Sequence, residues 1–266
     1  MGLVYGLYAP NAPNLIAPEV FGNAGRETVA ALRALDLRNR FRPDTILVAS
    51  PHWISRGPFL VQASVRPKQI YDFGGFPRKL YEVRYAPPGD PDLARILVEE
   101  GKRRHLDVEA TADWGLDHGA WATLMNLVPE ADIPVVPLSI APLPAEEHLA
   151  WGEAIGAAAA KSENRIAFVS TGSITHRLDM FDPSSSARWP EGDRIEKEIV
   201  DLVLARRYED LANFDSEKWA TVAPEGNLAP LFVMAGALGS GFRPHPVASE
   251  KAFGSVTLTT VEFLPE

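Results

Sequence analysis

Short apolar segments alternate with amphipathic helical patterns along the whole chain, and this alternation restricts the fold more than any other feature. Each apolar segment is bounded by turn residues, as is typical of strands in a buried sheet. The predicted strands are Leu3–Tyr8, Thr45–Ser50, Ile133–Ile140, Arg165–Thr171 and Val256–Phe263. The predicted helices are Asn23–Leu37, Asp90–His105, Trp121–Leu127, His148–Lys161, Arg194–Arg206 and Leu228–Leu238. Strands and helices in alternation favour an α/β fold with a central mixed sheet flanked by helices.

The chain shows no internal repeat, low-complexity tract or long linker, so we expect one domain over residues 1–266. The most loop-like segment, Asp182–Gly192, is expected to lie on the surface or over a site. Prolines follow several predicted strands, among them Pro10, Pro51 and Pro142. They stiffen the strand exits, which is where α/β proteins place their sites. We therefore expect the functional site at the carboxyl ends of the strands.

Composition excludes several kinds of chemistry. The chain has no cysteine, which rules out disulfides, thiolate metal sites and a cysteine nucleophile. Its formal net charge is −9 and it carries no basic run, so neither nucleic acid nor an anionic membrane is an expected partner. Neither a signal peptide nor a membrane-spanning run is predicted, and we expect a cytoplasmic protein.

Three of the six histidines stand beside predicted strand exits or at the start of a helix. His52 follows TILVASP, His118 lies in LDHGAW and His176 ends STGSITH. Because strand ends converge on one crevice, we predict that these three share it, where they could bind a metal or transfer protons. Each of them alone is more often a turn residue than a ligand. The others, predicted on helix surfaces or in a turn, are His105, His148 and His245.

The common nucleotide-binding and hydrolase motifs do not occur. The sequence has no G-x-G-x-x-G after a strand, no G-x-x-x-x-G-K-[ST], no H-E-x-x-H and no G-x-S-x-G. Neither a nucleotide-binding fold nor an α/β-hydrolase is therefore indicated.

Eight segments match a known family in the family's own order. They are APNAPNLI, PDTILVASPHW, YDFGGFPRKLYEVRYAPPGDPDLA, WGLDHGAW, ADIPVVPLSI, IAFVSTGSITHRL, LAPLFVMAGALG and FGSVTLTTVEF. On these segments the chain resembles the class III extradiol ring-cleaving dioxygenases, the superfamily of protocatechuate 4,5-dioxygenase and of DOPA-dioxygenase-like proteins. The resemblance implies cleavage of a catechol- or aminophenol-type ring beside its two heteroatom substituents, with O2 and a non-haem Fe(II).

The resemblance also assigns roles to the three histidines. In the family, two histidines and a carboxylate or third histidine hold the iron and leave positions open for the aromatic ring and O2. His52 matches the second ligand. His118 and His176 match two histidines that are not ligands, one acting as acid and base and one contacting substrate or oxygen. Imidazole titrates in the range needed to take a proton from a catechol and to return one on ring opening.

Two ligand positions depart from the family pattern. The position of the first ligand, a histidine in the family, is Asn11 here. The third ligand position, nine residues before Gly236, falls on Asn227, and Glu225 could replace it only if Glu225 precedes the helix. An amide oxygen binds first-row metals more weakly than imidazole, so we expect Fe(II) to be weakly held or absent.

Three hypotheses stay open. The first is an active Fe(II)-dependent extradiol dioxygenase. The second is a non-catalytic member, either a scaffold subunit or a binding protein that has lost the iron site. The third is a metal-independent or differently metallated enzyme on the same cleft, such as a hydrolase or isomerase, with His118 or His176 as the base. The expected partners are a small aromatic substrate and O2, with a homo-oligomer or a related paired subunit.

An aromatic group surrounds DFGGFP. Its members are Tyr71, Phe73, Phe76 and Tyr81. They are explained either as a hydrophobic patch under a loop, or as a pocket wall or subunit contact that stacks on flat rings. The neighbouring cations are expected to be solvated, with contact to a substrate carboxylate as the alternative. These cations are Arg78 and Lys79.

Overall fold

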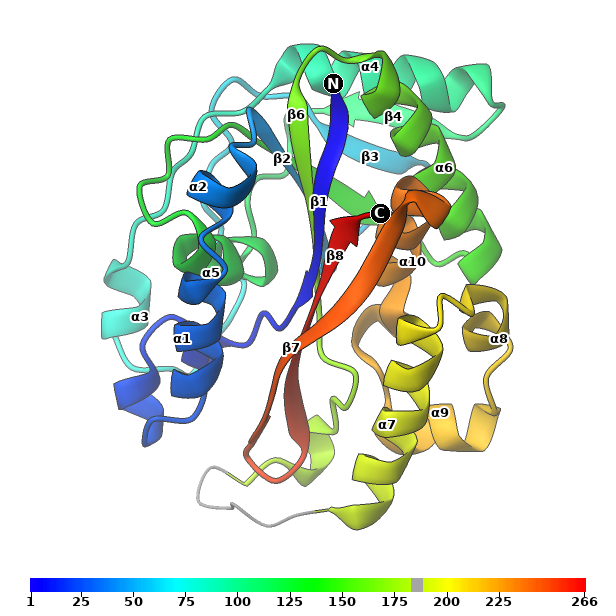
Figure 1. Ribbon diagram of the computed structural model, residues 1–266. Helices are drawn as coiled ribbons and strands as arrows, with labels where there is room; N and C mark the ends of the chain where they lie inside the picture. Colours follow the sequence, from blue (N-terminus) through cyan, green and yellow to red (C-terminus); the bar gives the residue numbers. More distant parts are fainter. Residues whose placement is uncertain (183–188) are drawn as a thin grey trace.

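The centre of the molecule is one mixed sheet, seen in a computed structural model that describes residues 1–182 and 189–266 (Figure 1). The strands are β1 (Gly2–Ala9), β2 (Thr45–Ile54), β3 (Phe59–Gln62), β4 (Val108–Thr111), β5 (Val135–Ile140), β6 (Arg165–Thr171), β7 (Phe242–Ala252) and β8 (Val256–Pro265). Within the described residues these eight strands have the order β4-β3-β5-β2-β6-β1-β8-β7. The mixed α/β architecture predicted from the sequence is therefore confirmed.

The middle of the sheet is parallel. β1 pairs with β6, β6 with β2 and β2 with β5, all in parallel register. β8 and β3 then add in antiparallel direction at either side of this group. Because β1, β6 and β2 are parallel neighbours, the segments that follow them leave the sheet at the same edge.

Helices cover both faces of the sheet (Figure 1). They are α1 (Arg26–Ala34), α2 (Leu37–Phe41), α3 (Lys79–Glu82), α4 (Pro91–Arg103), α5 (His118–Leu127), α6 (Ala145–Lys161), α7 (Pro190–Leu204), α8 (Tyr208–Ala212), α9 (Ser216–Val222) and α10 (Ala229–Leu238). One hydrophobic core, with Trp151 and Phe168, lies under α6 and α10. The other, with Trp121 and Tyr5, lies under α1 and α5. Among the described residues, none of the helices is long and apolar enough to cross a membrane.

The pair α6 and α10 packs with its backbones in close approach. A Cβ added to Gly152 would lie 2.1 Å from the carbonyl oxygen of Val233, and one added to Gly236 would lie 2.2 Å from that of Leu149. Neither position has room for a side chain, so glycine is what lets the two helices meet. This contact anchors α10, whose first turn follows a segment of the candidate site.

Among the described residues, three strands, three short helices and one helix break were not predicted from the sequence. The helices are α3, α8 and α9, of four to seven residues each. β3 and β4 are four residues each, too short for a clear alternating pattern. β7 is an exposed edge strand with two prolines, and its pairing with β8 forms it. The helix predicted over Asn23–Leu37 divides into α1 and α2 because Asp36 adopts a left-handed conformation with φ 46°. The predicted loop Asp182–Gly192 lies partly outside the described residues, and its last three residues already belong to α7.

The prediction for two histidines was wrong. His148 is 1% exposed instead of lying on a helix surface. Its ring packs edge-on against Phe59 with centroids 5.3 Å apart, and its Nδ1 donates to the carbonyl oxygen of Pro144 at 2.9 Å. His245 lies within β7 instead of in a turn.

Candidate functional site

The parallel strands deliver three of the predicted site residues to one edge of the sheet. Asn11 follows β1, His52 lies near the end of β2, and His176 follows β6. The pairing of β2 with β5 shifts register between Ala49 and Ile54, and His52 lies within this irregular stretch. Such irregularities re-aim side chains beside functional sites.

The fourth segment of the site is a short turn, η4 (Glu225–Leu228), which precedes α10. Gly226, Asn227 and Leu228 have φ values of 55°, 52° and 56°, all left-handed. This conformation separates the directions of Glu225 and Asn227. Glu225 lies before α10 and not within it, which is the condition under which it could replace Asn227 at the third ligand position.

Asn227 lies away from the histidines. Its Oδ1 accepts a hydrogen bond from Trp219 Nε1 at 3.1 Å, and its side chain lines a cavity of about 800 Å³. His148 is the histidine that lines this second cavity, whereas His52, His118 and His176 line another. Of the two residues considered for the third ligand position, the structure therefore brings Glu225 to the site and leaves Asn227 outside it.

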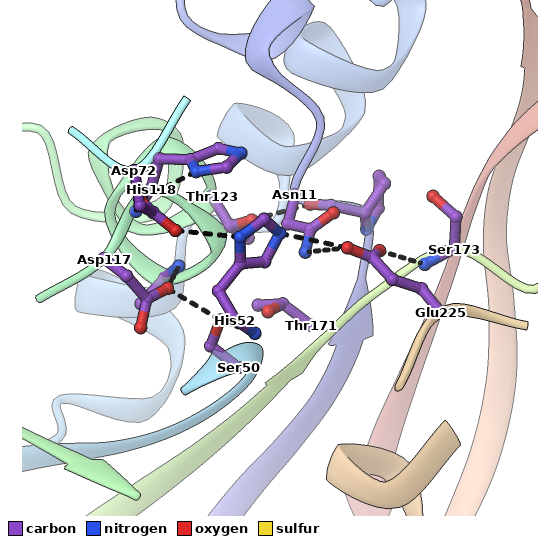
Figure 2. Close-up of polar contacts among 12 residues, drawn as sticks. Asn11, Ser50, His52, Asp72, Asp117, His118, Thr123, Thr171, Ser173 and Glu225 are labelled. Carbon is purple, nitrogen blue, oxygen red and sulfur yellow. Dashed lines mark hydrogen bonds and ion pairs between the residues drawn. The ribbon is translucent and has the colours of Figure 1, made fainter. Parts of the chain in front are cut away.

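Asn11, His52 and Glu225 meet at one carboxylate oxygen (Figure 2). Glu225 Oε1 lies 3.0 Å from His52 Nε2 and accepts a hydrogen bond from Asn11 Nδ2 at 3.3 Å. The other oxygen, Oε2, accepts from the backbone N–H of Ser173 at 3.1 Å. Three segments that are distant in sequence thus place an amide, an imidazole and a carboxylate within hydrogen-bonding distance.

Asp72 joins two of the histidines from the other side (Figure 2). His52 Nδ1 donates to Asp72 Oδ2 at 2.8 Å. His118 donates to Asp72 Oδ1 twice, from Nδ1 at 2.9 Å and from its backbone N–H at 2.8 Å. The rings of His52 and His118 lie edge to face with centroids 4.2 Å apart. One carboxylate therefore orients both rings.

His118 is placed by the first turn of α5. Asp117 caps the helix, since its carboxylate accepts from the backbone N–H of Ala120 at 3.2 Å. The same carboxylate accepts from Ser50 Oγ at 2.7 Å, which ties the helix start to β2. The LDHG motif thus combines a helix cap with a buried histidine, and this explains its local sequence.

The site has strongly shifted protonation equilibria. Burial alone would lower the pKa of His52, but hydrogen bonds from its ring to Asp72 and Glu225 outweigh it and raise the pKa to about 10. Burial would raise the pKa of Asp72, yet hydrogen bonds from His118 and His52 hold it well below its usual range. Burial would also raise the pKa of Glu225. Hydrogen bonds from His52 and Asn11, together with the electrostatic interaction with His176, lower it instead. The carboxylates of Asp72 and Glu225 on either side of the His52 ring thus favour its protonated form.

The three predicted histidines line one cavity of about 250 Å³. Asn11 and Glu225 line it too. The prediction that His52, His118 and His176 share a crevice is therefore confirmed, while their chemical roles stay predictions. His176 is held there by its backbone N–H, which donates to the carbonyl oxygen of Val222 at 2.8 Å.

Two groups of side chains could hold a divalent cation, and both include His52. In the first, single ligand atoms of His52, Asp72 and His118 lie within 4.8 Å of one another. In the second, His52 Nε2 meets Glu225 and Asn11. Metal-bound imidazoles commonly donate their other N–H to a carboxylate, which is what His52 Nδ1 does toward Asp72. The second group therefore suits the cation better, with Asp72 as the carboxylate behind His52.

Sequence reasoning did not identify Asp72 as a site residue. The signal was present, because Asp72 belongs to the YDFGGF segment already singled out for its aromatic residues. Asp72 and His118 are far apart along the chain, and only their spatial contact shows that one serves the other. The aromatic group divides into two parts, because Phe73 and Phe76 line the cavity and Tyr71 and Tyr81 do not.

The fold and the site together define an α/β protein with a histidine- and carboxylate-lined pocket at the carboxyl edge of its sheet. A family model described as the catalytic LigB subunit of aromatic ring-opening dioxygenase matches residues 29–260. The chain belongs to this family of aromatic ring-opening dioxygenases.

Individual relatives support the same family. The chain is 34% identical over 235 residues to 4,5-DOPA dioxygenase extradiol of Beta vulgaris, covering 84% of this chain and 83% of that protein. It is 42% identical to the 4,5-DOPA dioxygenase extradiol of Escherichia coli (strain K12), over 52% of this chain and about half (49%) of that protein's length. An uncharacterized Escherichia coli K12 protein, JW3007, has a similar fold, with a TM-score of 0.74 at 23% identity over 97% of this chain and 99% of that one.

Proposed function

We propose that this protein is a non-haem Fe(II)-dependent extradiol dioxygenase that cleaves a catechol- or aminophenol-type ring with O2. The observation that carries the proposal is the meeting of Asn11, His52 and Glu225 in a cavity that His118 and His176 also line. Family membership supports ring opening in general. Relatives named 4,5-DOPA dioxygenase extradiol and 2-aminophenol 1,6-dioxygenase beta subunit support these two ring types.

The donor set fits a divalent first-row cation, with one weak position. His52 Nε2 and Glu225 Oε1 are an imidazole nitrogen and a carboxylate oxygen, both common ligands of Fe(II). Asn11 would contribute its amide oxygen after rotation of the amide, which exchanges oxygen and nitrogen at nearly the same place. Bound Fe(II) would supply open positions for the two ring substituents and O2.

Of the remaining two histidines, His118 is the proposed acid and base. Asp72 occupies His118 Nδ1, so Nε2 is the nitrogen that can accept a proton from a ring hydroxyl. The carboxylate of Asp72 stabilises the imidazolium that forms, and the same nitrogen can later return the proton to the opened product. His176 lines the same cavity and is proposed to contact substrate or oxygen.

The proposal also covers the domain organisation, the cellular compartment and the oligomeric state. We propose that residues 1–266 act as one catalytic domain in the cytoplasm, with a small aromatic substrate and without nucleic acid or membrane partners. A homo-oligomer or a related paired subunit is proposed, because one relative is named as a beta subunit. Light scattering during size-exclusion chromatography measures the state directly.

A second candidate function is a non-catalytic member of the family. It is favoured by the asparagine at position 11, because an amide oxygen binds first-row metals more weakly than an imidazole nitrogen does. In this case the pocket would bind a ligand but not open its ring.

The test begins with protein purified without oxygen and titrated with Fe(II) by calorimetry. Catechol and 2-aminophenol are then added with O2, and oxygen uptake and ring-opened product are followed. His118→Gln should retain Fe(II) binding and lower turnover by about 10²–10⁴-fold, the usual contribution of a general acid–base residue. His105→Gln, at an exposed position, is the control. Iron binding without turnover would support the non-catalytic candidate, and turnover of other substrates without metal would support the metal-independent one.

A further inference from the structure

The mouth of the cavity is built from phenylalanines that come from four separate parts of the chain. Contacts between ring centroids connect them in the order Phe73–Phe76 at 5.7 Å, Phe76–Phe21 at 5.8 Å, Phe21–Phe253 at 6.1 Å and Phe253–Phe181 at 4.8 Å. All five rings line the cavity, and we call them the phenylalanine rim. Phe181 is 43% exposed, and together the five rings form a contiguous apolar group. A rim of this kind favours an apolar or aromatic group of a ligand.

Three cationic side chains beside the pocket form ion pairs with carboxylates that do not line it. Lys79 pairs with Glu19, and Arg78 pairs with Glu82 at 3.1 Å. Arg177, which directly follows His176, pairs with Asp179 at 2.6 Å. Among the described residues, the cavity is lined by no lysine or arginine.

The inner part of the cavity holds two polar side chains without partners in the described structure. Asn14 is 1% exposed, and neither Nδ2 nor Oδ1 has a hydrogen-bond partner. Ser173 is also 1% exposed, and its Oγ is unpartnered. Both line the cavity. Buried polar groups are normally satisfied, so these two point to a ligand that carries hydroxyl or amino groups.

The charge on the inner wall is negative. Glu225 lines the cavity, and Asp72 lies directly behind the two histidines. A ligand carboxylate at the rim would lose its hydration against phenyl rings and gain no lysine or arginine partner among the described lining residues, while the His52 ring is already paired with Asp72 and Glu225. A neutral substituent would lose nothing comparable.

We propose that the pocket selects a neutral catechol or aminophenol whose ring carries an apolar substituent and no carboxylate. Asn14 and Ser173 would bond its ring hydroxyl or amino groups, and the phenylalanine rim would pack on its substituent. The cavity of about 250 Å³ lies below the ~300–1,000 Å³ of common ligand pockets, which limits the ligand to one ring with a short chain. This assignment of substrate class rests on the proposed function.

The test compares two ligands of equal length, 4-propylcatechol and 3-(3,4-dihydroxyphenyl)propionate. Binding to the Fe(II)-treated protein is measured by calorimetry without O2, and turnover is measured separately with O2. We expect 4-propylcatechol to bind at least about tenfold more tightly, because the carboxylate must be desolvated. Equal or tighter binding of the propionate, or binding of neither ligand, would overturn the inference. Selective binding without any ring opening would instead contradict the proposed function and leave the binding preference standing.

Two variants test the rim and the inner wall. Leu178 is 60% exposed and lines the cavity, so Leu178→Arg adds a cation at the mouth and should raise propionate affinity about tenfold. Val65→Arg, at another exposed aliphatic residue (67%) outside the cavity lining, is the matched control and should leave the affinity unchanged. Asn14→Leu should weaken 4-propylcatechol binding while cooperative unfolding shows that the variant folds. Unchanged affinity in a folded Asn14→Leu protein would remove Asn14 from the proposal.

Discussion

Asp72 is the residue on which both site histidines depend. Its two oxygens accept hydrogen bonds from the rings of His52 and His118, which lie 20 and 46 residues away along the chain. A carboxylate behind a histidine fixes which nitrogen faces the site and how strongly it binds.

Asp72→Asn is expected to lower Fe(II) affinity by roughly 10–100-fold, the usual effect of removing an outer carboxylate. The amide has one acceptor oxygen where the carboxylate has two. It therefore cannot accept from His52 Nδ1–H with one oxygen and from His118 Nδ1–H with the other. Calorimetric titration with Fe(II) measures the change. Asp113→Asn, at an exposed aspartate, serves as the control, and equal affinity in the two variants would show that Asp72 does not support the ligand.

Asn11→His is expected to raise Fe(II) affinity by about 100-fold, because it places an imidazole where the amide now reaches Glu225. Asn227→His is the discriminating control. Its position faces Trp219 and the second cavity, so Fe(II) affinity should stay as in the parent. A gain at position 227 and none at position 11 would reverse the assignment of the two asparagines.

At the scale of elements, the left-handed turn η4 decides which side chain reaches the pocket. Leu228 adopts φ 56°, a conformation that costs a non-glycine residue about 1–2 kcal/mol. The turn persists because its neighbours hold it: α10 is packed tightly on α6, and the backbone N–H of Glu225 donates to the carbonyl oxygen of Ser173 at 3.0 Å.

Gly226→Ala is expected to lower the free energy of unfolding by about 1–3 kcal/mol. Its φ is +55°, and the new Cβ would lie 2.7 Å from Pro51 Cβ. Gly57→Ala is the control, since a Cβ there meets no atom within 4 Å, and it should change stability by less than about 0.5 kcal/mol. Urea unfolding compares the two. Similar losses in both variants would show that the turn is not strained against β2.

At the scale of the whole molecule, a buried carboxyl group links α7 to the sheet and to the segment that carries His176. Glu196 accepts hydrogen bonds from the hydroxyls of Thr175 and Thr259, both at 2.6 Å. Burial nevertheless raises the pKa of Glu196 above its ordinary value. At pH values between the ordinary and the raised pKa of Glu196, the folded protein keeps a proton that the unfolded chain releases.

This linkage makes the Glu196 contribution to stability fall as the pH rises from the ordinary glutamate value of 4.5 through the raised folded value. Glu196→Gln keeps the shape and removes the titration, so the difference in unfolding free energy between about pH 5 and about pH 8 should shrink. Urea midpoints at the two pH values provide the measurement. Glu217→Gln, at an exposed glutamate, should keep the parent's pH dependence, and a Glu196→Gln protein that also kept it would contradict the raised pKa.

The sequence by itself determined the central strands and the residues at their exits. β1, β2 and β6 were predictable because apolar runs with turn residues at their ends are local patterns, and a parallel sheet brings strand ends to one edge. His52 and His176 followed from that rule, whereas Asn11 followed from the family resemblance. Only the tertiary structure decided that Glu225 and not Asn227 faces the pocket, that Asp72 supports the histidines, and that distant phenylalanines form one rim. The reason is physical: periodicity belongs to a short stretch of backbone, whereas a left-handed turn, an edge strand such as β7 or a hydrogen bond between remote residues is stabilised by groups that only the folded chain brings together.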